Sequence, residues 1–247
     1  MKVIILCAGY ATRLYPLTLH KAKPLLEVKG KPIVEHLIDQ LVTLPSVFKI
    51  QIVTNDKFHD DFLQWRAWYG YEQFIEILND GSKSELDRRG AIGDLFFALE
   101  SDTEPDDLLI ITGDNYFDFR LSYFVLFSSL QSNPVIAVHN VGSKKLASQY
   151  GIVDINDHGQ VIRFEEKPKE PKTTLASIGL YYLPLEHQKL ISKYKNQNLP
   201  MDQIGYFIKW LAENTSVRAY PVLGNWYDIG DKKILEQLNG GFQFSSN

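Results

Sequence analysis

Residues 1–32, MKVIILCAGYATRLYPLTLHKAKPLLEVKGKP, join a short apolar run to a basic turn, and this junction decides the fold. The apolar run at 3–8 predicts a β-strand that is buried on both faces. The turn after it contains small residues and then basic ones: Ala8, Gly9, Ala11, Arg13 and Lys23. Backbone N–H groups in such a turn can approach an anion closely, and the basic side chains add donors and positive charge. The stretch therefore predicts a phosphate site, with a solvated basic loop as the alternative.

Three further apolar runs resemble the first and alternate with helical patterns. The runs lie at 49–55, 74–79 and 107–113. Apolar residues recur at helical spacing over 32–42, with Pro32 at the first helical position, and over 58–69 and 91–99. This alternation predicts an α/β fold with a Rossmann-like, doubly wound, mostly parallel sheet between two layers of helices. Ligands of such sheets bind beyond the carboxyl ends of the strands.

The rhythm changes after about residue 135. Shorter strands are predicted at 135–140, 151–157, 160–166 and 175–183, with a hairpin turn at 157–160. Helical patterns return near 185–194, 202–213 and 231–238. Because no Gly-, Pro- and Ser-rich linker separates the parts, we expect one domain over 1–240. It would consist of a first half, about 1–134, and a second half, about 135–240, with an embedded β-rich subregion. We expect the tail GGFQFSSN to be disordered or bound in an interface.

Composition limits the partners and the compartment. The 26 Lys and Arg residues against 30 Asp and Glu give a net charge of -4, so no nucleic-acid partner is expected. Cys7 is the one cysteine, which excludes an intrachain disulfide and favours a reducing compartment. Gly9 and Pro16 interrupt the first apolar run too early for a signal peptide or a membrane span. We expect a cytoplasmic protein without membrane contact, and its 13% aromatic content permits a homo-oligomer interface.

Two common phosphate-binding motifs do not account for the basic turn. A dinucleotide fingerprint needs three glycines and an acid about 20 residues further on, whereas AGYATR contains one glycine. A P-loop is excluded because G-x-x-x-x-G-K-[ST] occurs nowhere in the chain.

The segments LCAGYATRLYPLT and KAKPLLEVKGKPI resemble the opening signature of the sugar-1-phosphate nucleotidyltransferases, L-A-G-G-x-G-T-R-L-x-P-L-T followed by P-K-P-L. The resemblance implies a Rossmann-like fold whose loop holds a nucleoside triphosphate. It assigns nucleotide binding to Ala8, Gly9, Ala11, Thr12, Arg13 and Lys23. Two glycines of the signature are alanines here, which restricts the backbone. Cys7 stands where the signature has alanine, so we interpret it as a small buried residue and not as a nucleophile.

Two aspartates are candidate metal ligands. Asp114 follows the fourth apolar run, in TGDNYF, and Asp228 lies in NWYDIGD before the last predicted helix. From position alone, either is also compatible with a turn, and Asp231 with a helix cap. Nucleotidyl transfer needs its phosphate charges neutralised, commonly by Mg²⁺ held by one or two carboxylates. GDN and W-x-D-x-G are motifs of the resembled family, whose aspartates hold Mg²⁺ together.

A further charged run, RFEEKPKEP at 163–171, begins in the strand predicted at 160–166 and continues beyond its end. On its own it is most often a solvated loop. The family resemblance implies that Glu166 contacts sugar hydroxyls and Lys167 the sugar phosphate, in a pocket completed by Tyr150, Gly151 and Gly179. By the same resemblance, the first half binds the nucleotide and the second half the sugar phosphate.

The base contact departs from the family pattern. Many relatives have a glutamine before a loop resembling L-G-T-A-G-A, whereas this chain has LNDGSKSELDRRGAIGDL at 78–95. Gly90 matches the loop glycine, and Asn79 or Asp80 is expected to replace the glutamine. The base stays open, with UTP, dTTP or CTP favoured over GTP.

The predicted reaction joins a nucleoside triphosphate to a sugar 1-phosphate and releases pyrophosphate, with Mg²⁺ as cofactor. The expected catalytic residues are Arg13, Lys23, Asp114, Lys167 and Asp228. Two alternatives are kept: a phosphocholine-type cytidylyltransferase, and a non-catalytic subunit that senses nucleotide sugars. Because the sequence ends soon after the last motif, we expect neither the β-helical module of some relatives nor an acetyltransferase activity.

Overall fold

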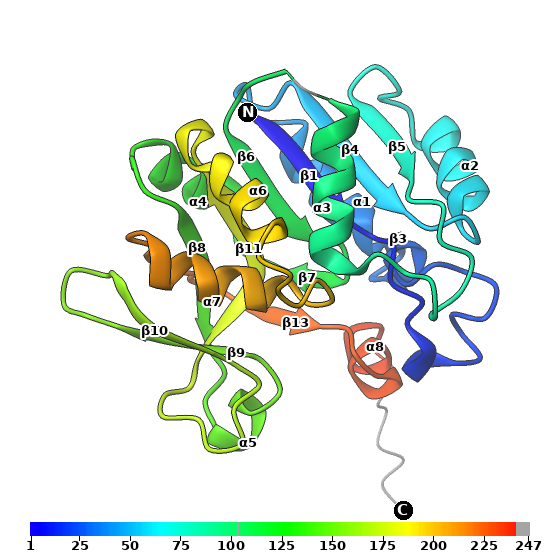
Figure 1. Cartoon of the computed structure of the whole chain (residues 1–247). Helices are drawn as coiled ribbons and strands as arrows, with labels where there is room; N and C mark the ends of the chain where they lie inside the picture. Colours follow the sequence, from blue (N-terminus) through cyan, green and yellow to red (C-terminus); the bar gives the residue numbers. More distant parts are fainter. Residues whose placement is uncertain (103, 241–247) are drawn as a thin grey trace, which may run out of the picture.

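The computed structural model describes residues 1–102 and 104–240, and Figure 1 shows their arrangement. Four parallel strands form one part of a nine-stranded sheet, in the order β6-β1-β4-β5. These strands are β1 (Lys2–Leu6), β4 (Lys49–Thr54), β5 (Ile75–Asn79) and β6 (Leu108–Thr112). They coincide with the four apolar runs. The residues of β1, β4 and β6 are mostly buried because helices cover both faces, whereas in β5, at the end of the order, only Ile75 and Ile77 are buried.

Antiparallel strands from the second half of the chain extend the same sheet. Strand β11 (Leu175–Leu183) pairs with β6 and joins β8 (Val135–Asn140) and β9 (Gly151–Ile155). Strand β10 (Val161–Glu166) forms the predicted hairpin with β9, and β12 (Arg218–Pro221) pairs with β8 in parallel. The hairpin projects from the sheet in Figure 1. Both halves therefore contribute strands to one sheet.

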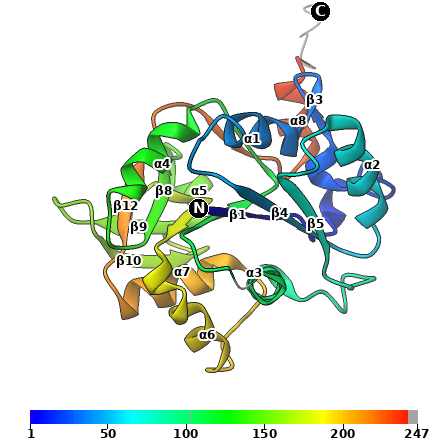
Figure 2. The same ribbon diagram turned by 90° about the horizontal axis from the view of Figure 1, so that it is seen from above.

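Helices cover the two faces of the sheet, as Figure 2 shows. One face carries α1 (Ile33–Leu41), α2 (His59–Tyr69) and α4 (Leu121–Ser129), and the other carries α3 (Gly90–Ser101), α6 (Lys189–Lys195) and α7 (Ile204–Asn214). Each face has its own apolar core. In the first core, Leu37 and Phe62 are fully buried, and in the second, Leu95 and Phe207. The predicted three-layer α/β fold is confirmed.

Several predicted boundaries were wrong in detail. The helical pattern near 185–194 divides into a 3-10 turn, η3 (Leu185–His187), and α6. Pro32 ends the short strand β3 (Lys31–Pro32), which pairs with β2 (Glu27–Val28), so α1 begins one residue later than predicted. Helix α4 was not predicted because the five consecutive apolar residues at 123–127 in its sequence, LSYFVLFSS, obscure a 3.6-residue period. Nor was the short helix α5 (Lys144–Ala147).

The last predicted helix is present as α8 (Lys232–Leu238), and Asp231 caps it, because its Oδ1 accepts a hydrogen bond of 3.0 Å from the Ile234 N–H. No helix among residues 1–102 and 104–240 has the length and apolar character needed to cross a membrane. The tail that was expected to be disordered or in an interface lies, from residue 241 on, outside the described residues.

A small second sheet positions the residues that follow β6. Strands β7 (Asn115–Phe117) and β13 (Trp226–Asp228) pair antiparallel, with Asp228 opposite Asn115. The Ile229 N–H also donates to the Asp114 carbonyl over 3.3 Å. This pairing brings the GDN and W-x-D-x-G segments side by side at the carboxyl ends of β6 and β1.

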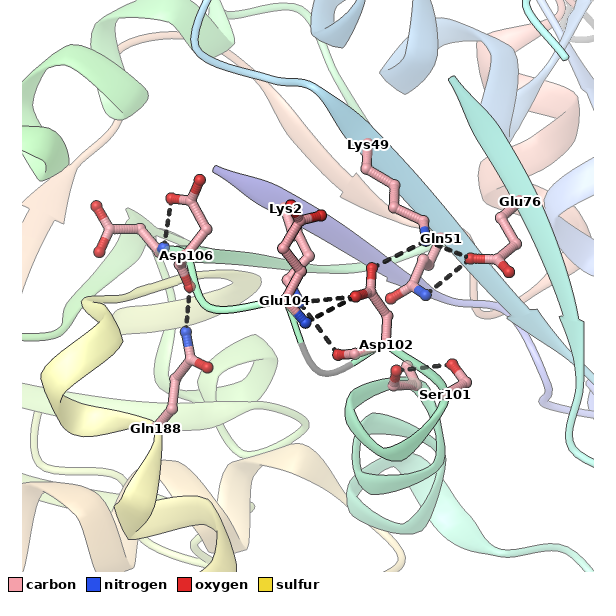
Figure 3. A network of polar contacts seen from close by, with 11 residues as sticks. Lys2, Lys49, Gln51, Glu76, Ser101, Asp102, Glu104, Asp106 and Gln188 are labelled. Carbon is pink, nitrogen blue, oxygen red and sulfur yellow. Dashed lines mark hydrogen bonds and ion pairs between the residues drawn. The ribbon is translucent and has the colours of Figure 1, made fainter. Parts of the chain in front are cut away.

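A network of ion pairs links the amino ends of the parallel strands, as Figure 3 shows. The ammonium of Lys2, which is 2% exposed, donates to the Asp102 carbonyl over 3.2 Å and lies 3.5 Å from its carboxylate. Asp102 also accepts from Lys49 over 2.9 Å, and Lys49 in turn contacts Glu76. These pairs hold the amino ends of β1 and β4 in place, so we interpret the charged residues there as structural. The expected ligand site lies at the carboxyl ends of the same strands.

Candidate active site

Asp114 and Asp228 meet around one buried ammonium group, that of Lys23. Asp114 directly follows β6, Asp228 ends β13, and Lys23 opens the short turn η2 (Lys23–Leu25). The Lys23 Nζ is 2.8 Å from Asp114 Oδ2 and 3.6 Å from Asp228 Oδ1. The structure therefore brings together three residues that the sequence places in separate motifs.

The charges in this cluster shift one another's pKa. Desolvation lowers the pKa of Lys23, but the carboxylates of Asp114 and Asp228 together raise it by more than that, so the net shift is upward. Desolvation raises the pKa of Asp114, yet the charge and hydrogen bond of Lys23 outweigh it and hold this pKa below its usual value. Desolvation and the charge of Asp114 raise the pKa of Asp228 despite Lys23. Lys23 thus stays charged and acts as the counter-ion of the carboxylate pair.

The donor set fits a magnesium ion. Asp114 and Asp228 keep 41% and 33% of their side chains exposed, so both carboxylates can reach a ligand from solvent. Mg²⁺ in proteins is commonly bound by one or two carboxylates and completes its shell with water and substrate phosphates. Within the described residues, no group of three or more His, Cys, Asp and Glu side chains is placed to hold a metal.

Two cavities meet at this cluster. The first, of about 260 Å³, lies between the loop after β1, η2 and the start of α3. Its lining includes Asp114 and five further residues predicted to bind nucleotide: Ala8, Gly9, Ala11, Lys23 and Gly90. The second cavity, of about 290 Å³, lies against β11 and the end of β10. Its lining includes all the residues predicted to bind sugar phosphate, namely Tyr150, Gly151, Glu166, Lys167 and Gly179, together with Asp228. Ala91, Thr112, Asp114 and Asp202 line both cavities.

The second cavity combines a desolvated acid with an aromatic wall. Burial raises the pKa of Glu166, and the charge of Lys167 opposes that shift. The rings of Tyr150 and Trp226 pack edge to face, with centroids 4.9 Å apart, and the Trp226 N–H donates to Asn115 over 3.0 Å. A carboxylate that accepts hydroxyl hydrogen bonds beside an apolar ring surface is suited to a polar, ring-shaped ligand such as a sugar.

Four residues with predicted nucleotide roles line neither cavity: Thr12, Arg13, Asn79 and Asp80. Thr12 and Arg13 are exposed on the turn η1 (Thr12–Leu14). The Asn79 side chain donates to Asp56 and accepts from the Gly81 N–H, each over 2.8 Å. Asp80 is 2% exposed, and its carboxylate accepts from the Ser82 N–H over 2.7 Å. Asn79 and Asp80 are thus engaged locally in this structure.

Asp94 lines the first cavity but was not singled out from the sequence. It lies on α3, is 5% exposed, and its Oδ1 has no hydrogen-bond partner within the described residues. Desolvation, together with the charge and hydrogen bond of Asp80, raises the pKa of Asp94 to about 8 despite the opposing charge of Arg89. The available signal was an acid on the otherwise apolar buried face of GAIGDLFFAL.

The raised pKa of Asp94 predicts a pH-dependent stability. An unfolded aspartate has a pKa of about 3.9, below the folded value, so the folded state loses stability as pH rises from about 4 towards 8. Asp94→Asn removes this dependence. Each pH unit between these two pKa values changes the free energy of unfolding by about 1.4 kcal/mol. We therefore expect urea denaturation to show that the stability of the variant relative to the native chain is higher at pH 8 than at pH 5, by about 3–4 kcal/mol. Asp60→Asn, at a side chain that is 91% exposed, should show no such change, and equal behaviour of the two variants would refute the prediction.

Comparison with known proteins identifies the family. The family model described as nucleotidyl transferase matches residues 2–242, so the chain belongs to the nucleotidyl transferase family. The membership implied by the opening signature is thereby confirmed. The chain is 28% identical, over 97% of its length, to the bifunctional protein GlmU of Methanocaldococcus jannaschii, of which it covers 55%. It is 29% identical, over 97% of its length, to a protein assigned as a mannose-1-phosphate guanyltransferase in Sulfolobus acidocaldarius, of which it covers 62%. The chain thus spans little more than half the length of these relatives.

A solved structure shares the fold. The crystal structure of a protein assigned as a glucose-1-phosphate thymidylyltransferase from Bacillus anthracis, in complex with a sucrose, matches with a TM-score of 0.80 and 24% identity. The match covers 100% of this chain and 97% of the other. It confirms the Rossmann-like architecture described above.

Proposed function

We propose that the protein transfers a nucleotidyl group from a nucleoside triphosphate to a sugar 1-phosphate and releases pyrophosphate. The observation that carries this proposal is the position of Asp114, which lines both cavities and contacts Lys23 at their junction. A nucleotide in the first cavity and a sugar phosphate in the second would meet beside these charges. The names of the relatives, which include a mannose-1-phosphate guanyltransferase and a glucose-1-phosphate thymidylyltransferase, support this substrate class.

In the proposed reaction, an oxygen of the sugar phosphate attacks the α-phosphorus, and the bond from that phosphorus to the pyrophosphate oxygen breaks. An ionised phosphate is already a nucleophile, so no general base is required, and catalysis depends on alignment and charge stabilisation. Asp114 and Asp228 would hold Mg²⁺, which would supply positive charge to neutralise the phosphates. Lys23 would hold phosphate oxygens of the nucleotide, and Lys167 would orient the attacking phosphate. Burial raises the pKa of the Cys7 thiol well above its usual value, which argues against a role as nucleophile.

Arg13 has its phosphate role from the opening signature alone. It lies two residues after Ala11, which lines the first cavity, and it is exposed. We further propose that the protein is cytoplasmic and that its nucleotide substrate is a pyrimidine nucleoside triphosphate. In this proposal, the chain forms one domain in which residues 1–134 bind the nucleotide and residues 135–240 bind the sugar phosphate.

A substrate matrix tests the proposal. Purified protein with Mg²⁺ is given each of UTP, dTTP, CTP and GTP with each of several hexose 1-phosphates, and pyrophosphate release is measured. We expect release only when both substrates are present, with a pyrimidine triphosphate preferred. Phosphocholine with CTP serves as the competing pair, and release from that pair alone would favour a cytidylyltransferase for phosphorylated alcohols. Binding of nucleotide sugars without turnover of any pair would favour a sensing subunit.

A further inference from the structure

The segment 200–203, Pro-Met-Asp-Gln, lies between the two cavities and contacts residues on both sides. On the side of the first cavity, the Ala91 and Ile92 N–H groups at the start of α3 donate to the carbonyls of Asp202 and Met201, each over 3.0 Å. The Asp202 carboxylate also pairs with Arg88 over 2.9 Å. The segment is therefore anchored to the first helical turn that lines the first cavity.

On the side of the second cavity, Gln203 holds the ammonium of Lys167. The Lys167 Nζ donates to Gln203 Oε1 over 2.7 Å, whereas the nearest carboxylate, that of Glu166, is 3.8 Å away. Gln203 precedes α7 but makes no side-chain cap to that helix, so its side chain is available for this contact. Both Gln203 and Lys167 line the second cavity.

Lys167 needs such a contact because its side chain is otherwise loosely held. The side chain is 48% exposed, and its residue adopts a left-handed φ of 46°, a backbone conformation that non-glycine residues rarely occupy. A lysine has four rotatable side-chain bonds, so an unrestrained ammonium would sample many positions. A neutral amide oxygen restricts the ammonium without neutralising it, whereas a carboxylate at the same distance would also cancel its charge.

We propose that Gln203 is a positioning residue that aims the Lys167 ammonium at the phosphate of the sugar 1-phosphate. The segment 200–203 fixes Gln203 by its contacts with Arg88 and α3. This inference rests on the proposed function, and it adds a residue outside the E-E-K-P, GDN and W-x-D-x-G motifs. Because Gln203 acts through Lys167, replacing Gln203 should weaken binding of the sugar phosphate and leave binding of the nucleotide unchanged.

Steady-state kinetics of Gln203→Met tests the proposal, because methionine keeps the size of the side chain and removes the acceptor oxygen. We expect the KM for the sugar 1-phosphate to rise about tenfold and the KM for the triphosphate to stay within about twofold. The matched control is Gln197→Met, in the same segment between α6 and α7. Gln197 Oε1 accepts a hydrogen bond of 2.9 Å from the Trp210 N–H, and Gln197 lines neither cavity. The control should leave both KM values unchanged.

A double-mutant cycle with Lys167→Met separates positioning from a general structural effect. If Gln203 acts through Lys167, adding Gln203→Met to Lys167→Met changes kcat/KM by less than about twofold. A full tenfold further loss in the double variant, or a rise in both KM values for Gln203→Met, would overturn the inference. If the native protein releases no pyrophosphate from any substrate pair, it is the proposed function that fails.

Discussion

Asp114→Asn is expected to lower kcat for pyrophosphate release about a thousandfold, because it removes the carboxylate that lines both cavities and pairs with Lys23. Asparagine has nearly the same shape and retains an oxygen that can accept the Lys23 hydrogen bond. The folded state should therefore persist, with Asp228 still 3.6 Å from the ammonium. Activity is measured at saturating substrates, and stability by urea denaturation.

A matched control for this variant is Asp118→Asn, four residues further along the same segment. Asp118 accepts hydrogen bonds from Asn225 over 2.7 Å and lines neither cavity. We expect near-native kcat for this control. Native activity of Asp114→Asn, with native folding, would show that Asp114 takes no part in the chemistry.

The second large effect is expected for Gly90→Ala, which should lower the free energy of unfolding by about 2–4 kcal/mol. Gly90 has a left-handed φ of +76°, and a Cβ there would lie 2.6 Å from the Met201 carbonyl and 2.7 Å from the Asp202 Cα. These are backbone atoms, so they cannot move aside by a rotamer change. The segment 200–203 would be pushed from α3, which should also raise the KM for the sugar 1-phosphate.

Gly142→Ala provides the comparison for the backbone cost alone. Gly142 has a φ of +75°, and a Cβ there would meet nothing within 4 Å. We expect this variant to lose about 1 kcal/mol, the cost of a left-handed alanine. Denaturation midpoints of the two variants are compared with that of the native chain. Equal losses would mean that the close approach of Met201 to Gly90 contributes nothing.

The main features of the fold could be predicted because their signals are local. The strands β1, β4, β5 and β6 are nearly continuous apolar runs, and α1 has an apolar stripe at helical spacing. Helix α4 gave no such signal, since the consecutive apolar residues at 123–127 obscure the helical spacing. Short strands such as β7 and β13 depend on pairing between distant segments, which no local pattern contains.

The candidate site was predictable only as far as its motifs extend. The GDN and W-x-D-x-G motifs pointed to Asp114 and Asp228, and the structure brings both to Lys23. Gln203 had no sequence signal, because its contact with Lys167 depends on the path of the chain between α6 and α7. Asn79 or Asp80 was expected to contact the base. Short-range hydrogen bonds with Gly81 and Ser82 engage both side chains in the structure, and the base contact stays a prediction.

An isotope measurement tests the central claim most directly. A sugar 1-phosphate labelled with ¹⁸O in its phosphate is incubated with the protein, Mg²⁺ and the preferred triphosphate, and the products are analysed by mass spectrometry. Attack of the sugar phosphate on the α-phosphorus predicts that all the label appears in a nucleotide sugar and none in pyrophosphate. Label in free phosphate, or no nucleotide sugar with any substrate pair, would contradict the account.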